Sequence, residues 1–197
     1  MADVERARVK EAPQLVRIVV AIDPATTSKA GSDETGIIVA GVGRDRHGYV
    51  LQDLSGRYPP DGWARRAIGV FDEHRADRVI AEVNNGGELV EHTLRTVRPA
   101  ISYKAVHASR GKQVRAEPVA ALYEQGRVHH VGCLAALEDQ LTNYVPGVSA
   151  GSPDRLDALV WAITELLPST RAIPGDLDWS GANESLSRRS YYRQEIA

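Results

Sequence analysis

Short apolar runs rich in β-branched residues recur along the chain and predict buried strands. They lie at residues 17–23, 77–87 and 101–109, and residues 36–56 form two such runs joined at 44–48. A shorter extended piece is expected at 127–132. The segment 44–48 is polar and contains glycine, which favours a hairpin between the two runs.

Segments with apolar residues at helical spacing lie between and after these runs. This spacing predicts helices over 60–76, 88–97, 115–126, 134–145 and 152–167. A hairpin followed by strand–helix–strand crossovers gives an α/β fold with a mixed sheet, which has an antiparallel hairpin edge and parallel strands and is flanked by helices.

The two ends of the chain differ from the part between them. Residues 1–16 are charged and predict a linker or a frayed helix, and residues 17–168 carry all the regular patterns of one domain. Residues 169–197 are rich in turn-forming and polar side chains. They predict a C-terminal tail that is loosely ordered or folds on a partner.

Composition excludes several classes of protein. The chain has 197 residues, 43% of them hydrophobic, and a formal net charge of −2, so any nucleic-acid contact must rest on a local basic patch. There is one cysteine, Cys133, which excludes an internal disulfide and is expected in the core.

His129 and His130 are interpreted as strand and surface residues without metal-ligand spacing.

No stretch has the length and apolarity of a membrane-spanning helix, and the N-terminus has no signal-peptide pattern. We therefore expect no membrane partner and a cytoplasmic protein, in the host cell if it belongs to a phage. The sequence also lacks G-x-x-x-x-G-K-[ST], so it carries no P-loop ATPase.

Acidic residues stand near the ends of two predicted strands. Asp23 closes the run 17–23, and Glu82 lies near the end of 77–87. If these strands are parallel neighbours, both acids emerge at the carboxyl edge of the sheet, where open α/β folds bind ligands. Each acid alone is also a common turn former.

The helix predicted at 152–167 opens with two further acids. Asp154 suits the first turn, where a carboxylate favours the helix dipole. Asp157 lies at the edge of the apolar stripe, where a carboxylate is costly unless something pairs with it. A salt bridge to Arg155 or Arg171 is one explanation, and a place in a metal site is the other.

Together these acids form a cluster at one sheet edge with no matching cations in the local sequence. Carboxylates that repel each other need a metal or shifted protonation to coexist. Hard oxygen ligands suit Mg²⁺ or Mn²⁺. Two such ions, roughly 3.5–4 Å apart, can activate water and stabilise the leaving oxygen in phosphodiester cleavage.

Residues beside the cluster are candidates for contact with DNA. Asn84 and Asn85, followed by two glycines, let a backbone approach a substrate closely, although a plain turn explains them too. Arg110, Lys112 and Arg115 form a basic loop before the helix 115–126, which suits phosphates. A solvated charge run remains an equal alternative.

Four stretches together resemble the C-terminal nuclease domain of tailed-phage and gene-transfer-agent terminase large subunits. They are AIDPATTSKAGSDETGIIVAG, VIAEVNNGGELV, HASRGKQVRAEPVAALYEQGRVHHVG and SPDRLDALVWAITELL, and the resemblance covers residues 17–167. It implies an RNase H-like fold and a divalent-metal endonuclease that cuts concatemeric DNA during packaging, with magnesium or manganese as cofactor, as two ions.

The resemblance implies roles for particular residues. Asp23, Glu82 and Asp157 match the catalytic, metal-binding acids, and Asp154 matches the D-x-x-D-A-L spacing of the related Holliday-junction resolvases. The implied partners are double-stranded DNA, the terminase ATPase domain, the portal and the small terminase subunit. The ATPase domain is absent from this sequence, which is either an excised domain, with 1–16 as a linker stub, or separately encoded.

Three other interpretations stay open. A Holliday-junction resolvase-like nuclease would share the fold and prefer four-way junctions. A non-catalytic module would dock on DNA or the portal with its acids merely solvated. An actin-like phosphotransferase would need a second phosphate-binding hairpin, which the sequence does not offer. Metal-dependent DNA cleavage separates the nucleases from the rest.

Overall fold

The computed structural model of the chain describes residues 2–25, 34–83, 87–108, 111–144 and 152–168. The tail predicted at 169–197 lies outside these residues, as do Asn84, Asn85 and Arg110. The described helices and strands fall within one compact unit, residues 1–167.

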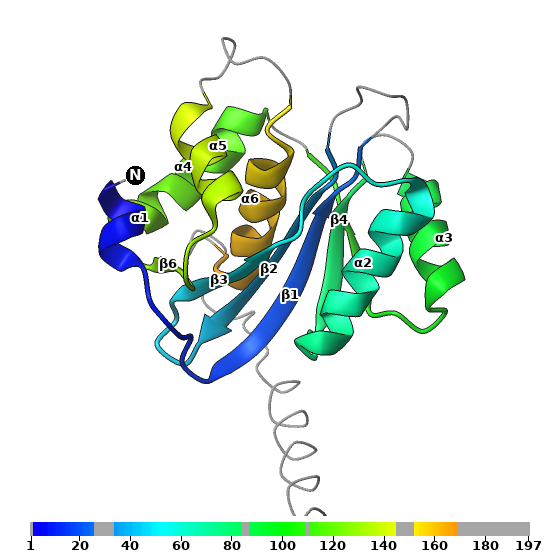
Figure 1. The fold of residues 1–197 in the computed structure, drawn as a ribbon, viewed down its shortest axis with the longest axis horizontal. Coiled ribbons are helices and arrows are strands. Elements are labelled where there is room, and N and C mark those ends of the chain that lie inside the picture. Colours follow the sequence, from blue (N-terminus) through cyan, green and yellow to red (C-terminus); the bar gives the residue numbers. More distant parts are fainter. Residues whose placement is uncertain (1, 26–33, 84–86, 109–110, 145–151, 169–197) are drawn as a thin grey trace, which may run out of the picture. The chain divides into compact units, whose positions relative to one another are not determined.

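A mixed six-stranded sheet forms the centre of this unit, in the order β5-β4-β1-β2-β3-β6 (Figure 1). The strands β1–β2–β3 pair antiparallel, whereas β1–β4, β4–β5 and β3–β6 pair parallel. This confirms the mixed sheet predicted from the sequence. The bounds are β1 Leu15–Asp23, β2 Gly36–Gly43, β3 Gly48–Asp53, β4 Arg78–Glu82, β5 Tyr103–Val106 and β6 Val128–His130.

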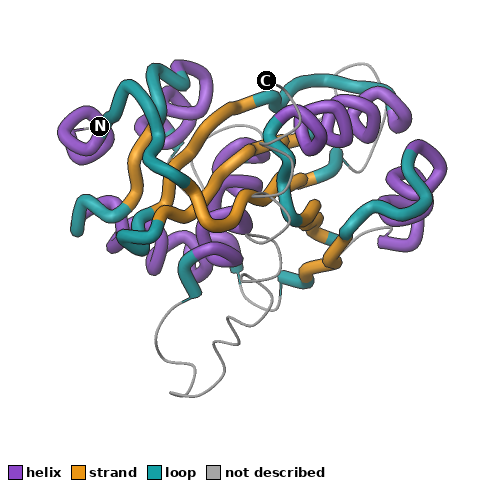
Figure 2. The backbone as a smooth tube through the Cα atoms, turned by 90° about the horizontal axis from the view of Figure 1, so that it is seen from below, coloured by secondary structure: helices purple, strands orange, loops and turns teal. Residues whose placement is uncertain are grey.

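Helices cover both faces of the sheet (Figures 1 and 2). One face packs against α2 and α3, and the other packs against α6, with α4, α5 and α1 beside it. The bounds are α1 Ala2–Ala7, α2 Pro60–Glu73, α3 Gly87–Val97, α4 Lys112–Glu124, α5 Ala135–Asn143 and α6 Asp154–Leu166.

Alternation along β1 divides the core between the two faces. Val19 and Ala21 pack toward α6, whereas Val20 and Ile22 pack toward α2 and α3. All eight residues of β2 are buried, which places this strand beneath helices on both sides. Leu159, Val160 and Ile163 of the apolar stripe predicted for α6 are buried in this core, so the packing fixes the position of its first turn.

The segment 1–16, predicted as a linker or a frayed helix, begins with a short helix that packs on the domain. Residues 2–7 form α1, in which Val4 and Ala7 are buried, and Val9 forms a β-bridge with Val131. Strand β1 begins at Leu15. This segment contains too few apolar residues to show a helical periodicity in the sequence. Its contacts with the rest of the domain therefore determine its structure.

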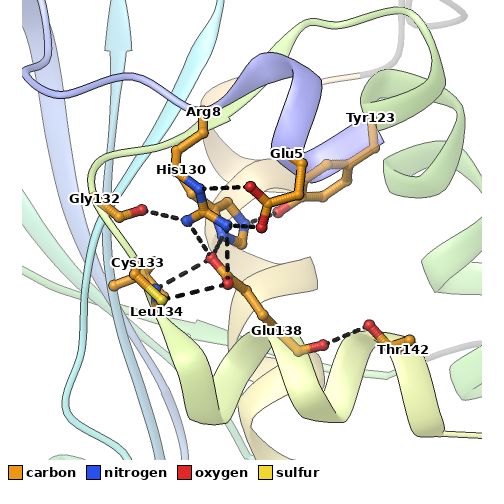
Figure 3. Close-up of polar contacts among 9 residues, drawn as sticks. All are labelled: Glu5, Arg8, Tyr123, His130, Gly132, Cys133, Leu134, Glu138 and Thr142. Carbon is orange, nitrogen blue, oxygen red and sulfur yellow. Dashed lines mark hydrogen bonds and ion pairs between the residues drawn. The ribbon is translucent and has the colours of Figure 1, made fainter. Parts of the chain in front are cut away.

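A buried carboxylate, Glu138, ties α1 to α5 and β6 (Figure 3). Arg8 donates to both of its oxygens, at 2.7 and 3.0 Å, and also pairs with Glu5. His130 Nδ1 donates to Glu138 at 2.9 Å, which leaves Nε2 to accept from the Tyr123 hydroxyl at 2.7 Å. We call these five residues the Glu138 network.

The Glu138 network satisfies its central carboxylate. The hydrogen bond from Arg8, followed by those from His130 and the Leu134 N–H, outweighs burial and lowers the pKa of Glu138 to about 2. Two predictions fail here. His130 is fully buried rather than on the surface, because Tyr123 and Glu138 supply its partners, and Cys133 is exposed rather than in the core.

Candidate active site

Strands β1 and β4 bring two acids to the same edge of the sheet. They are parallel neighbours, with Ile22 opposite Ala81 as the last paired residues. Asp23 and Glu82 each follow directly and emerge at the carboxyl edge. The sequence predicted this arrangement, and such an edge is where open α/β sheets bind ligands.

Helix α6 places its first turn over this edge through a contact at Gly36. Gly36 lies opposite Asp23 in the β1–β2 pair. A Cβ atom on Gly36 would stand 2.0 Å from the backbone oxygen of Asp154, so only glycine permits this approach. Asp154 and Asp157 are consequently buried beside Asp23. We call Asp23, Glu82, Asp154 and Asp157 the sheet-edge cluster.

Arg155, between the two helix acids, anchors the same turn from the other side. It donates to Asp53 of β3 and to Glu34, both at 2.8 Å. Arg155 therefore does not pair with Asp157, which was one of the explanations left open for that carboxylate. The two contacts fix the rotation of α6 about its axis.

Two cations from α4 lie at the sheet-edge cluster. Lys112 forms an ion pair with Asp157, and Arg115 Nη1 lies 3.0 Å from a Glu82 oxygen and Nη2 3.5 Å from one of Asp157. The local sequence of the acids supplies no matching cations, as expected, but the fold brings two from α4. Both cations are distant in sequence from the acids they meet, so local inspection could not pair them.

The basic loop predicted before the helix at 115–126 also differs from the structure. Helix α4 begins at Lys112, so Lys112 and Arg115 both lie in its first turn. Lys112 Nζ donates to Ser152 Oγ at 2.9 Å in addition to its ion pair. The role of Lys112 and Arg115 in DNA contact stays a prediction, as do those of Asn84, Asn85 and Arg110, which lie outside the described residues.

Trp161 is a site residue that the sequence analysis did not identify. Its indole Nε1 donates to Glu82 at 2.7 Å, and the Arg115 guanidinium lies 4.7 Å from the centre of its ring. Trp161 therefore holds both members of the Glu82–Arg115 pair. Its position one helical turn after Asp157 was the available signal, because residues four apart share a helix face.

Charge is not balanced within the site. Burial, followed by the charges of Asp157, Glu82 and Asp154, raises the pKa of Asp23 to about 8, although Lys112 opposes this. Burial also raises the pKa of Asp157, against the opposing effect of Lys112 and Arg115. Within the part of the chain that the structure describes, Lys112 and Arg115 are the cations in ion-pair contact with these four carboxylates.

This electrostatic strain is what a divalent cation would relieve, and carboxylate oxygens are the ligands that Mg²⁺ and Mn²⁺ prefer. Within the described residues, no three His, Cys, Asp or Glu side chains have the spacing of a formed metal site. The ion pairs to Lys112 and Arg115 draw Asp157 and Glu82 toward α4. The donor chemistry fits a divalent metal, and the carboxylates would have to turn to bind one.

Comparison with known families identifies the chain. The model of the terminase RNase H-like domain matches residues 20–166, well over half of the chain. The chain belongs to this family. Membership confirms the RNase H-like fold and supports a nuclease role in phage DNA packaging. A search of curated proteins gives no match.

Solved structures with the same fold include three terminase nucleases. The chain resembles the large terminase nuclease of thermophilic phage G20c with bound magnesium, at 15% identity and a TM-score of 0.61, covering 79% of this chain and 84% of that one. The P22 large terminase nuclease domain has 14% identity and a TM-score of 0.60, with coverages of 81% and 87%.

A third relative is a mutant nuclease domain of the large terminase subunit gp2 of bacterial virus Sf6, solved with manganese and beta-thujaplicinol. It has 14% identity and a TM-score of 0.57, and the match covers 83% of this chain and 96% of that one. At these identities the likeness concerns the fold. Among the described residues, no helix is long and apolar enough to cross a membrane.

Proposed function

We propose that this terminase-family domain is a divalent-metal-dependent DNA endonuclease that cuts concatemeric phage DNA during genome packaging. One observation carries the proposal. Four carboxylates meet at the carboxyl edge of an RNase H-like sheet, and burial, followed by the charges of the other three, raises the pKa of Asp23 to about 8. Such repulsion destabilises the folded chain in the absence of a ligand, whereas a bound divalent metal ion would relieve it.

In this proposal Asp23, Glu82 and Asp157 are the catalytic metal ligands, and Asp154 is an additional ligand. Two bound Mg²⁺ or Mn²⁺ ions would supply the positive charge that activates water and stabilises the leaving oxygen. The magnesium bound to the G20c nuclease and the manganese in the Sf6 domain support this choice of metal.

The remaining site residues position these ligands. Trp161 and Arg115 hold the Glu82 carboxylate from two sides, while Lys112 and Arg115 hold Asp157. These contacts keep the carboxylates at the site, and they would be exchanged for contacts with metal when the carboxylates turn to bind it. Lys112 stays partly exposed, with 43% of its side chain accessible, so it can also meet a phosphate that enters the site.

The proposed substrate is double-stranded DNA, delivered by the terminase ATPase domain together with the portal and the small terminase subunit, in the host cytoplasm. Asn84, Asn85 and Arg110 are proposed DNA contacts beside Lys112 and Arg115. The net charge of −2 argues for weak binding by the domain alone, because the phosphate backbone is held mainly through cations. Partners would then provide most of the affinity.

A plasmid-cutting assay tests the proposal. The full chain is incubated with supercoiled plasmid in Mg²⁺, Mn²⁺, Ca²⁺ or EDTA, at high protein concentration and low salt. We expect nicked and linear plasmid with Mg²⁺ and Mn²⁺ and intact plasmid with EDTA. ATP should have no effect, because the chain lacks a P-loop.

Two outcomes would point elsewhere. Faster cutting of a four-way junction than of a linear duplex of equal length would favour the resolvase alternative. Intact plasmid in every metal, with DNA still bound, would favour the non-catalytic docking module.

A further inference from the structure

Three cations gather around one carboxylate at the end of α6 away from the sheet-edge cluster. Glu165 is paired with Arg17 of β1 at 2.6 Å, with Lys104 of β5 at 2.7 Å and with Arg78 of β4 at 3.6 Å. The Glu165 side chain is only 10% exposed, whereas the cations are 35–47% exposed. The carboxylate lies beneath and the cations face solvent. We call Arg17, Arg78 and Lys104 the basic patch.

The basic patch has an excess of positive charge. Its three cations share the single carboxylate of Glu165, whereas at Arg155 one cation serves two acids. Asp77, next to Arg78 in sequence, accepts from the backbone N–H of Ile18 and forms no ion pair with these cations. Among the described residues, Glu165 is the one acid in ion-pair contact with them, so the basic patch has more positive than negative charge in a chain whose net charge is −2.

The basic patch lies on the same face of α6 as the site. Asp157, Trp161 and Glu165 are spaced four residues apart, so they form one stripe along the helix. Eight residues of helix span about 12 Å. In B-DNA this distance corresponds to about three or four base pairs, because successive base pairs are about 3.4 Å apart. Strand β5 lies at the edge of the sheet, and its residue Lys104 is exposed beside this stripe.

We propose that the basic patch binds the phosphate backbone of duplex DNA a few base pairs from the bond that is cut. The proposal rests on the nuclease function proposed above and names where its substrate lies. The spacing lets one duplex contact the basic patch and the sheet-edge cluster together. Flexible, partly exposed cations suit phosphate contact, which carries no sequence information.

Equilibrium binding of a 30-base-pair duplex in EDTA tests the proposal, since without metal no cleavage intervenes. The double variant Arg78→Gln/Lys104→Gln is compared with wild type between 50 and 200 mM salt. We expect the slope of log K against log[salt] to fall by about 2 and affinity at 100 mM salt to fall about tenfold. The matched control is Arg65→Gln/Arg66→Gln on α2, which removes the same charge.

A second variant changes the charge in the opposite direction. Glu165→Gln leaves the cations and removes their counter-charge, so it should tighten DNA binding several-fold. General damage to the fold would weaken binding instead, and melting curves of each variant verify folding. Equal losses in the two double variants, or unchanged binding in Arg78→Gln/Lys104→Gln, would overturn the proposal.

The plasmid assay keeps the two proposals apart. If wild type cuts plasmid with metal while the basic patch variants bind duplex as wild type does, the patch proposal fails and the nuclease stands. If wild type binds duplex through the patch but cuts nothing, the nuclease proposal fails. A wild-type chain that does not bind duplex at all overturns the patch as a DNA contact and favours an acidic protein partner.

Discussion

Two groups of buried carboxylates lie on the α6 side of the sheet, and their electrostatics are opposite. In the Glu138 network one carboxylate receives hydrogen bonds from Arg8, His130 and a backbone N–H, and its pKa falls to about 2. In the sheet-edge cluster, burial and three neighbouring acids raise the pKa of Asp23 to about 8.

This difference separates a structural use of charge from the functional use proposed for the sheet-edge cluster. The partners in the Glu138 network stabilise the ionised form of Glu138. This carboxylate therefore contributes to the free energy of unfolding at neutral pH. The sheet-edge cluster retains repulsion that its two cations among the described residues do not cancel, and the proposed metal ions would relieve it. Burial alone does not distinguish the two, because Glu138 and Asp157 are each 3% exposed.

The largest expected effect is on catalysis. Asp157→Asn removes a proposed metal ligand from a helix whose apolar stripe does not need it, so cutting should fall at least about 1000-fold while the fold survives. Plasmid cutting in Mn²⁺ measures the cleavage rate, and circular dichroism shows whether the variant is folded. Asp139→Asn, at an exposed acid of α5, is the matched control and should cut normally. A folded Asp157→Asn variant that cuts at the wild-type rate would remove Asp157 from the site.

The next effect is on stability, in the other group. Glu138→Gln leaves the partly buried Arg8 guanidinium with only the exposed carboxylate of Glu5 as an ion-pair partner and should lower the free energy of unfolding by about 3 kcal/mol. Urea unfolding measures this loss of stability. The cutting rate per folded molecule should stay at the wild-type value. Glu91→Gln, in the exposed Glu91–Arg95 pair, should cost less than about 0.5 kcal/mol. Equal costs would mean that the Glu138 network does not stabilise the fold.

Gly36→Ala tests the contact that joins the sheet to the cluster. The added Cβ meets the Asp154 backbone, so α6 must shift, which should cost about 2 kcal/mol and reduce cutting. Gly69→Ala in α2, where a Cβ meets nothing within 4 Å, is the matched control and should not reduce stability. Unimpaired cutting by Gly36→Ala would show that the position of the first turn is not critical.

A pH dependence of stability is expected in the absence of metal, spread over several pH units. Because the pKa of Asp23 is raised to about 8 in the folded state, that state keeps a proton which the unfolded state releases near pH 4. Stability should therefore fall as pH rises from about 4 to about 8, by at most about 1.4 kcal/mol per pH unit from this group.

Glu138 gives the opposite sign in a different window. Its pKa is lowered to about 2, so its contribution is complete above about pH 4.5 and is lost as pH falls toward 2. Unfolding in EDTA across pH 2–9 measures both trends, and Asp23→Asn should abolish only the upper one. A wild-type stability that is constant from pH 5 to pH 8 would contradict the raised pKa of Asp23.

Sequence patterns predicted the parts of this molecule that depend on local periodicity. The β1 and β4 runs and the α6 stripe were predicted, and with them the meeting of Asp23, Glu82 and Asp157 at one edge. Lys112, Arg115 and Trp161 were not assigned to the cluster, because their contacts with it join residues 33 to 79 positions apart. Residues 2–7 carry too few apolar positions to predict the docking of α1.

The central claim is that the sheet-edge cluster is a divalent-metal site, and a melting experiment at pH 8 tests it most directly. Wild type and Asp23→Asn are titrated with Mn²⁺. At 100 times the Kd, wild type should gain about 2.7 kcal/mol, which is about 5–10 °C in Tm for a domain of this size. The Asp23→Asn variant should gain little at the same concentration. Equal gains in the two proteins, or no gain in wild type, would contradict the claim.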